Sequence, residues 1–342
     1  TGWFIPTKPG DHEASAAPVA DAGGSVALKE VLAPKALQNQ AATVPPTNFA
    51  AQIQRSTIAG IDTLVCPTAA ENVVTIRGNL RAGEAAAANR ALAHLTASML
   101  DKGTKKHTQF ELADLLEKVG ATIEFEVTND TLEFTAQCLS ENIRLVVSLL
   151  GEQLRAPAFA EDEFTKVKTQ ALAETQQAQE DTDTQAAIAF AQAAFPPGHP
   201  GRRFSIPEQL AAIEKRTLED VRRFHEMHFG TGNIHVVAVG EVNTEEFRAE
   251  VAKAFEGWQP AKAKPSAISK PKETMGAVVP VPMAEKTSVS VVIGQPTGTK
   301  AGDPEWLPLT LATAALGRGF TSRLVGTVRD REGLTYGIGA GI

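Results

Sequence analysis

The spacing of apolar residues changes abruptly near residue 85, and this change constrains the fold more than any other feature of the sequence. Apolar and polar residues first alternate in three runs, which predicts strands at 54–58, 61–66 and 73–80. From about residue 86, apolar residues recur at helical spacings as far as Asp101, and Gly103 occupies a C-terminal cap position. Strands followed by helices favour an α+β fold over a regular βαβ series.

The rest of the chain continues this mixture. Further strands are expected at 121–128, 131–138 and 234–240, and further helices at 108–119, 141–154, 161–181, 183–194, from 206, at 217–229 and at 244–256. Thr108 and Glu111 form a capping-box pattern at the start of one helix, and Gly120 follows its end. After a stretch rich in Lys and Pro, another αβ unit is expected, with a strand at 287–294, helices at 305–316 and 322–330, and a strand from Leu334.

This pattern divides the chain into five segments. They are a short strand at 1–7, a linker rich in Ala, Gly and Pro at 8–50, a first αβ domain at 51–259, a second linker at 260–280 and a partial αβ domain at 281–342. The chain begins without Met and ends inside an alternating run, so we expect it to be a piece of a longer polypeptide. An exported or periplasmic location is expected only if a preceding segment carries a signal.

Composition excludes several classes of protein. The 33 Lys and Arg residues against 40 Asp and Glu give a net charge of −7, and there is no basic stripe with interleaved aromatics, so nucleic acid is not expected as a partner. No apolar run is long enough to predict a transmembrane helix. Cys66 and Cys138 lie far apart and form no metal-type pair, so we expect two buried free thiols.

The most informative chemistry lies on the helix expected after residue 86. His94 and Ser98 are four residues apart, so a helix places both on one face. Two histidines at this spacing can share a zinc ion, and a glutamate between them can act as a general base. Here Ser98 is a poor zinc ligand, and Ala97 has no proton-accepting group. The alternative for His94 is an ordinary packing or hydrogen-bonding role.

Other candidate sites are weaker. His225 and His228 could converge on one helix face, but no third ligand is evident nearby, so we expect helix-end histidines that face solvent. The glycine-rich segments at 317–319 and 337–341 lack the Lys-Ser/Thr ending of a phosphate loop, and we expect them to serve in turns and packing.

Arg329 and Tyr336 form a more promising pair. Tyr336 is the only tyrosine of the chain, and it follows a corner between an expected helix and an expected strand. A guanidinium at the end of the helix and a phenol on the strand could both reach one carbonyl oxygen or oxyanion. The alternative is a structural salt bridge beside a half-buried tyrosine.

Four segments together resemble the pitrilysin/insulinase-type zinc peptidases, the inverted-motif zincins. The stretch 90–104 resembles the zinc helix of that family and the turn after it, although His94-Leu95-Thr96-Ala97-Ser98 stands where the family reads His-x-x-Glu-His. Residues 195–200 resemble the family's Phe-Pro-x-His-Pro element, residues 229–240 its closing strand, and residues 319–336 its second-domain motif. The motifs occur in the family's order, and the resemblance covers roughly residues 50–342.

The resemblance implies a role for each matching residue. His94 occupies the first zinc-ligand position, Ala97 replaces the general base and Ser98 replaces the second ligand. Glu174 matches the distal ligand by its spacing and its helical context; without the resemblance it would be a solvated surface group. Arg329 and Tyr336 match the pair that contacts substrate near the scissile bond in this family.

The resemblance therefore implies a non-catalytic half of a clamshell zinc metalloendopeptidase. It predicts an α+β fold with the architecture of a peptidase half: mixed, largely antiparallel sheets, each covered by helices, in two related αβ domains of which the second is incomplete. Residues 1–7 would be the tail strand of a preceding unit. This half would bind unfolded peptide and present Arg329 and Tyr336 to a zinc ion in a partner half, either fused or a separate homologous subunit. The chain alone would hold no zinc and would be inactive.

Two alternatives remain. The same fold could serve as a structural, assembly or peptide-binding subunit with no proteolytic role, as in related core subunits of respiratory complexes. His94 and Glu174 could also form an unusual metal site completed by water.

Overall fold

A computed structural model describes residues 49–86, 90–263 and 278–342 of the chain. The expected strand at 1–7, nearly all of the linker at 8–50 and most of the linker at 260–280 lie outside the described residues. The described part begins with one short helix, α2 (Phe49–Gln52), and residues 50–342 form one compact unit. No helix in these ranges is both long and apolar enough to cross a membrane.

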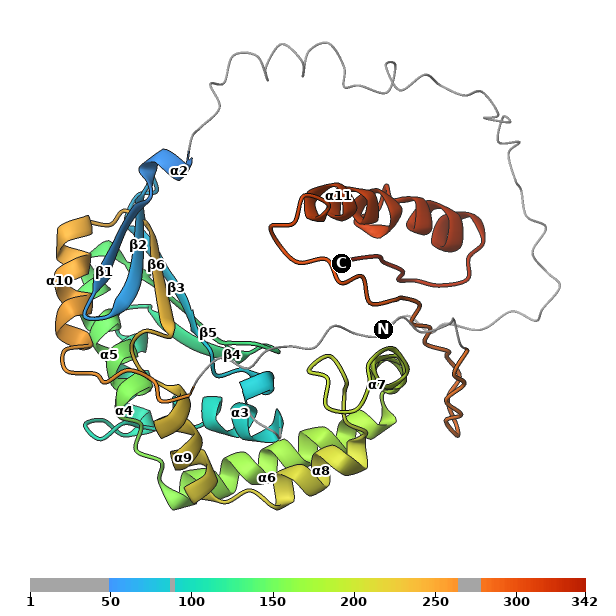
Figure 1. Ribbon diagram of the computed structural model, residues 1–342, viewed down its shortest axis with the longest axis horizontal. Coiled ribbons are helices and arrows are strands. Elements are labelled where there is room, and N and C mark those ends of the chain that lie inside the picture. Colours follow the sequence, from blue (N-terminus) through green and yellow to red (C-terminus); the bar gives the residue numbers. More distant parts are fainter. Residues whose placement is uncertain (1–48, 87–89, 264–277) are drawn as a thin grey trace, which may run out of the picture. The chain divides into compact units, whose positions relative to one another are not determined.

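A six-stranded mixed sheet organises residues 54–240 (Figure 1). Its strands are β1 (Gln54–Ile58), β2 (Ile61–Pro67), β3 (Val73–Leu80), β4 (Thr122–Val127), β5 (Leu132–Leu139) and β6 (Ile234–Gly240). Their spatial order is β1-β2-β6-β3-β5-β4, and every neighbouring pair is antiparallel except β2 and β6. All six strands were expected from the sequence, and the α+β class is confirmed.

The last strand in sequence lies at the centre of the sheet. Ala238 on β6 pairs with Val65 on β2 and with Ile76 on β3, and all three side chains are fully buried. Next to this pairing, Gly78 is required by the packing, because a Cβ atom there would lie 2.1 Å from the ring of Phe134. Strand β6 therefore joins β2 to β3, and the centre of the sheet is packed with apolar side chains.

Helices α5 (Ile143–Arg155) and α10 (Thr244–Ala254) pack against each other and against the sheet (Figure 1). A Cβ atom at Gly151 would lie 3.0 Å from the Cβ of Ala254, so the small residues let the two helices approach closely. The main core cluster includes the inward residues of the strands together with apolar side chains of these helices. Cys66 and Cys138 are both free and buried, as expected.

A second apolar cluster packs around the helix on which the zinc-site residues were expected. Helix α3 (Arg90–Ala97) places Leu95 there, with Met99 just beyond its end. These side chains meet residues of α6 (Glu161–Gln177) and α9 (Leu218–His228). The expected helix ends four residues early, at Ala97, and residues 98–102 continue in turns up to Gly103, which has a φ of 108°.

Side chains cap several of the remaining helices. These helices are α4 (Gln109–Glu117), α7 (Thr182–Ala194) and α8 (Ile206–Glu214). The box predicted for Thr108 and Glu111 forms at the start of α4, and Ser205 forms a similar box with Glu208 at α8. Short 3-10 turns at Glu84–Ala86, Ser140–Asn142 and Ala178–Glu180 link neighbouring elements.

In the C-terminal residues 278–342, the expected helices form but the expected strands do not. Helix α11 (Trp306–Gly317) forms as expected, while the helix expected at 322–330 begins at Val325 and is a π-helix, η4 (Val325–Arg331). Residues 287–294 and 334–342 form no strand. A strand needs a hydrogen-bonded neighbour, and the described residues provide none for these two segments.

Candidate functional site

The first zinc-ligand position is engaged by a carboxylate of the same chain. Nε2 of His94 lies 2.9 Å from Oε1 of Glu84, and Oε2 of Glu84 lies 3.1 Å from Nη1 of Arg90. Burial by itself would raise the pKa of Glu84, but the hydrogen bond with His94 and the charge of Arg90 hold it below its ordinary value. Glu84 is therefore an anion that occupies a nitrogen through which His94 could bind a metal.

The residues at the other two expected zinc-site positions, Ala97 and Ser98, have no side chain suited to zinc chemistry. Ala97, at the general-base position, is only 7% exposed and belongs to the main core cluster. Ser98 is exposed, and its backbone N–H donates to the carbonyl of His94 at 2.9 Å, which continues the helical spacing by one residue. The helix thus keeps His94 and Ser98 on its outer side and uses Ala97 for packing.

Glu174, at the distal-ligand position, lies on α6 and faces solvent. Its Oε1 accepts a hydrogen bond from Nε2 of Gln170 at 2.8 Å, a pairing along one helix face. Within the described ranges, no group of three or more His, Cys, Asp or Glu side chains could hold a metal ion. A catalytic zinc site normally takes three protein ligands, so the residues at these positions do not fit zinc.

The expectation that His225 and His228 face solvent is wrong. Nε2 of His225 lies 2.8 Å from the carbonyl oxygen of Leu154, and its ring contacts those of Phe159 and Phe229. Burial lowers the pKa of His225 to about 4, so the imidazole is neutral at physiological pH. The ring of His228 lies tilted against that of Phe224, with the centroids 4.4 Å apart, and burial lowers the pKa of His228 as well. Packing of α9 against α5 and the sheet, which helical spacing alone does not reveal, explains the difference.

Arg329 and Tyr336 lie together, and a third side chain joins them. Cζ of Arg329 lies over the ring of Tyr336, 4.9 Å from its centroid, and over the ring of Phe320, 5.3 Å from its centroid. Tyr336 is 88% exposed and Phe320 is 78% exposed. Among the described residues, the one ion pair of Arg329 is with Asp330 and spans 3.9 Å. The alternative of a salt bridge beside a half-buried tyrosine therefore does not describe this pair.

Two residues of these sites were missed by the sequence reasoning. Glu84 lies before the zinc-helix region, and only its contact with His94 distinguishes it from other surface glutamates. Phe320 belongs to the motif that carries the resemblance, and an aromatic residue directly after a glycine was the signal available for it.

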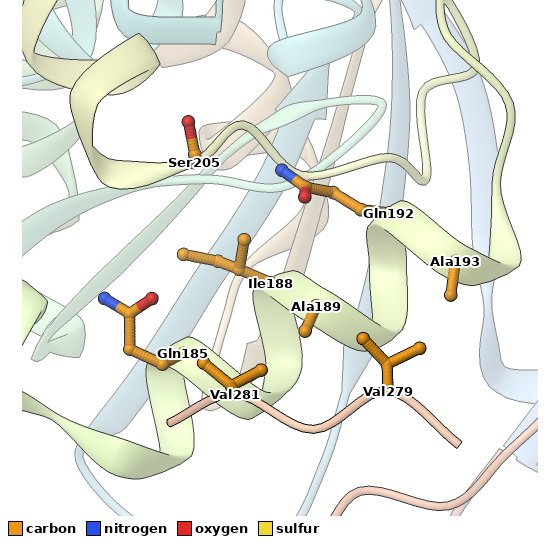
Figure 2. Close-up of a pocket in the computed structure, with 8 residues that line it drawn as sticks. All are labelled: Gln185, Ile188, Ala189, Gln192, Ala193, Ser205, Val279 and Val281. Carbon is orange, nitrogen blue, oxygen red and sulfur yellow. The ribbon is translucent and has the colours of Figure 1, made fainter. Parts of the chain in front are cut away.

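Two cavities lie away from the residues expected to be functional. A cavity of about 490 Å³, shown in Figure 2, is lined along α7 by Gln185, Ile188, Ala189, Gln192 and Ala193, and also by Ser205, Val279 and Val281. No ionisable side chain lines it, so it offers no acid–base chemistry. A wider cavity of about 980 Å³ lies among α5, α9 and α10, and it is lined by more basic than acidic side chains.

Comparisons with known proteins place these features in one family. The family model described as Peptidase M16 inactive domain matches residues 215–342, and the one described as Insulinase (Peptidase family M16) matches residues 80–202. An uncharacterized zinc protease of Streptomyces coelicolor is 24% identical over 294 residues, covering 84% of this chain and 63% of that protein. The non-peptidase homolog YmxG of Helicobacter pylori is 26% identical over 247 residues, covering 72% of this chain and 56% of that protein.

Solved structures show the same fold. A peptidase M16 inactive domain from Pseudomonas fluorescens matches with a TM-score of 0.69 and 22% identity, covering 83% of this chain and 69% of that one. Pitrilysin matches with a TM-score of 0.56 and 19% identity, covering 65% of this chain and 24% of that one. The chain spans about three fifths of the length of the curated relatives it matches.

The family models and the relatives indicate the same family as the sequence resemblance. The relatives include proteins described as zinc proteases and one described as a non-peptidase homolog. In this chain Glu84 engages His94, and neutral Ala97 and Ser98 stand where the sequence resemblance leads one to expect the general base and the second ligand. The chain belongs to the insulinase-type M16 peptidase family and corresponds to a non-catalytic half of such an enzyme.

Proposed function

We propose that this chain binds unfolded peptide and supplies Arg329 and Tyr336 to a zinc site on a partner half, which is either fused to it or a separate homologous subunit. The observation that carries the proposal is the contact between Arg329 and Tyr336 at an exposed surface. This pair remains in place while the zinc-helix positions have lost their ligand and base. A chain of this kind needs a partner to supply the metal and the general base.

The chemistry of the pair suits a peptide carbonyl. A guanidinium is a permanent cation with N–H donors in one plane, and a phenol adds an O–H donor. Donors placed in advance around a carbonyl oxygen stabilise the negative charge that develops there as water attacks. Zinc in the partner half would supply the Lewis acid and the bound water. Arg329 and Tyr336 would then bind and orient the substrate and stabilise the oxyanion.

The test is reconstitution with a homologous subunit or fused half that carries an intact His-x-x-Glu-His motif. We expect no peptidase activity from this chain alone, because loss of general-base catalysis by itself costs a factor of about 10² to 10⁴. In the reconstituted enzyme, Tyr336→Phe should lower kcat by about 10² to 10³ and change KM little, as for other oxyanion donors. Unchanged kcat in the Tyr336→Phe complex would refute the assignment.

A second candidate function is a purely structural or assembly role with the same fold. The non-peptidase homolog among the relatives favours keeping this alternative. It predicts a stable complex with the partner whose activity is indifferent to both Arg329→Met and Tyr336→Phe. The same reconstitution therefore separates the two functions.

A further inference from the structure

Phe320 is an exposed aromatic residue that the proposed role of Arg329 and Tyr336 does not explain. Its side chain is 78% exposed, so it adds little to the apolar core of the protein. The contact that its ring makes is with the guanidinium of Arg329, whose Cζ lies 5.3 Å from the ring centroid. A large apolar ring at the surface with a cation over it suggests a role through that cation.

The backbone before Phe320 is built to bring its ring to this place. Helix α11 ends at Gly317, where a Cβ atom would lie 2.3 Å from the backbone nitrogen of Ala340, so only glycine fits. Gly319 then adopts a φ of 85°, in the left-handed region that favours glycine. The N–H of Ser322 donates to the carbonyl of Gly319 at 3.2 Å and closes the turn that carries Phe320.

Arg329 and Tyr336 approach the same point from the other side of the motif. Arg329 lies in the π-helix η4, a form of helix that is frequent at functional sites. Gly333, with a φ of 62°, turns the chain after this helix, and its N–H donates to the carbonyl of Arg329 at 3.1 Å. Tyr336 follows that turn, so residues 319–336 bring two aromatic rings to one guanidinium.

Two aromatic rings on one guanidinium can hold the cation in place before a ligand binds. A free arginine side chain samples many rotamers, and this entropy is lost when the group is held for binding. Each cation–π contact favours the held position before a ligand arrives and so offsets part of that loss. The neighbouring carboxylate of Asp330, 3.9 Å away, is too distant to orient the guanidinium firmly. Cζ of Arg329 lies over both rings, and 29% of the side chain remains exposed and accessible to an acceptor.

We infer that Phe320 is a positioning residue that holds the guanidinium of Arg329 ready to donate to a backbone carbonyl of a bound extended peptide. This inference rests on the proposed peptide-binding function and adds a third member to its site. It predicts that Phe320 acts only through Arg329. Tyrosine should replace Phe320, because its ring offers the same face to the cation, whereas leucine should not.

The test is a double-mutant cycle on the full chain, with a fluorescein-labelled unstructured casein-derived peptide as the probe and fluorescence anisotropy as the measurement. We expect Phe320→Leu to weaken binding about 3- to 10-fold. Phe320→Tyr should stay within about 2-fold of the native chain. In the Arg329→Met background, Phe320→Leu should have no further effect, because the partner of the ring is gone. Thermal unfolding should be the same for the native chain and Phe320→Leu, since the ring is exposed.

Each outcome bears on one proposal. If the native chain binds the peptide but Phe320→Leu binds equally well, the role of Phe320 is refuted and the proposed function stands. If Phe320→Leu weakens binding by the same factor with and without Arg329, the ring contacts the peptide directly and the positioning role is refuted. If the native chain does not bind the peptide, the proposed function fails and the role of Phe320 fails with it.

Discussion

Two regions of the chain, residues 50–263 and residues 278–342, are both rich in apolar side chains. They differ in how many of these side chains are buried. In the first region, strands and helices share a continuous core in which Phe134, Phe247 and Phe255 are at most 1% exposed. In the second, Val289 is 89% exposed and Ile293 is 92% exposed. Apolar composition alone therefore does not produce a core; the first region has one because its six strands find their partners within it.

Helix α11 makes the same contrast within a single element. It contains no charged residue and is apolar on every side, a pattern that is typical of a helix surrounded by protein. Nevertheless, Leu307 is 64% exposed and Leu311 is 62% exposed. By contrast, α5 presents one apolar face, and that face is buried against the sheet and α10. The two helices show that periodicity indicates which face can be buried, whereas burial itself requires a packing partner.

The largest predicted effect compares one large apolar side chain from each region. Phe247→Ala removes a fully buried ring from the main core and should lower the free energy of unfolding by about 3–5 kcal/mol. Leu311→Ala should change it by less than about 0.5 kcal/mol, because the side chain is mostly exposed. Urea unfolding followed by intrinsic tryptophan fluorescence measures both. Equal losses in the two variants would show that α11 belongs to the same cooperative core.

A second prediction concerns pH and the first region only. The pKa of His225 falls from 6.5 to about 4 on folding, so the unfolded chain takes up this proton more readily than the folded chain. Stability from the neutral imidazole is fully present above pH 6.5 and is lost as the pH falls toward about 4, by roughly 3 kcal/mol in all. The lowered pKa of His228 acts in the same direction.

The control for this prediction is His225→Gln, which keeps a side-chain donor for the carbonyl of Leu154 but cannot titrate. Between pH 6.5 and 4, the free energy of unfolding of His225→Gln should fall less than that of the native chain. Urea titrations at several pH values, followed by intrinsic tryptophan fluorescence, measure the effect in both chains. A pH dependence of equal size in both chains would show that His225 is not its source.

The smallest predicted effect concerns the polar contacts that the described residues make between the two regions. Nζ of Lys286 lies 2.8 Å from Oε2 of Glu180, and the hydroxyls of Thr182 and Ser290 are 2.7 Å apart. Exposed ion pairs contribute about 0–1 kcal/mol, so removing residues 264–342 should lower the free energy of unfolding of the first region by no more than about 1 kcal/mol. Lys286→Ala in the full chain is the matched control, and hydrogen exchange of the sheet amides is the measurement. A drop of several kcal/mol would mean that the second region stabilises the first.

Local signals in the sequence predicted much of the fold. The alternation on β2, β3 and β5, the capping box of Thr108 and the helical spacing along α5 each involve residues close in the chain, so their physical cause is visible in a short stretch. Strands at 287–294 and from 334 were predicted by the same rule and did not form, because strand pairing depends on a distant partner.

The same distinction between local and distant causes applies to the candidate site. The sequence by itself determined which chemistry is missing, since Ala97 and Ser98 cannot act as a base and a zinc ligand whatever their surroundings. It also determined that Arg329 and Tyr336 lie near each other along the chain. Only the tertiary structure decided that Glu84 engages His94, that His225 is buried and neutral, and that Phe320 meets the guanidinium of Arg329. Side-chain identity limits what a residue can do, whereas its partners depend on how distant segments and turns bring atoms together.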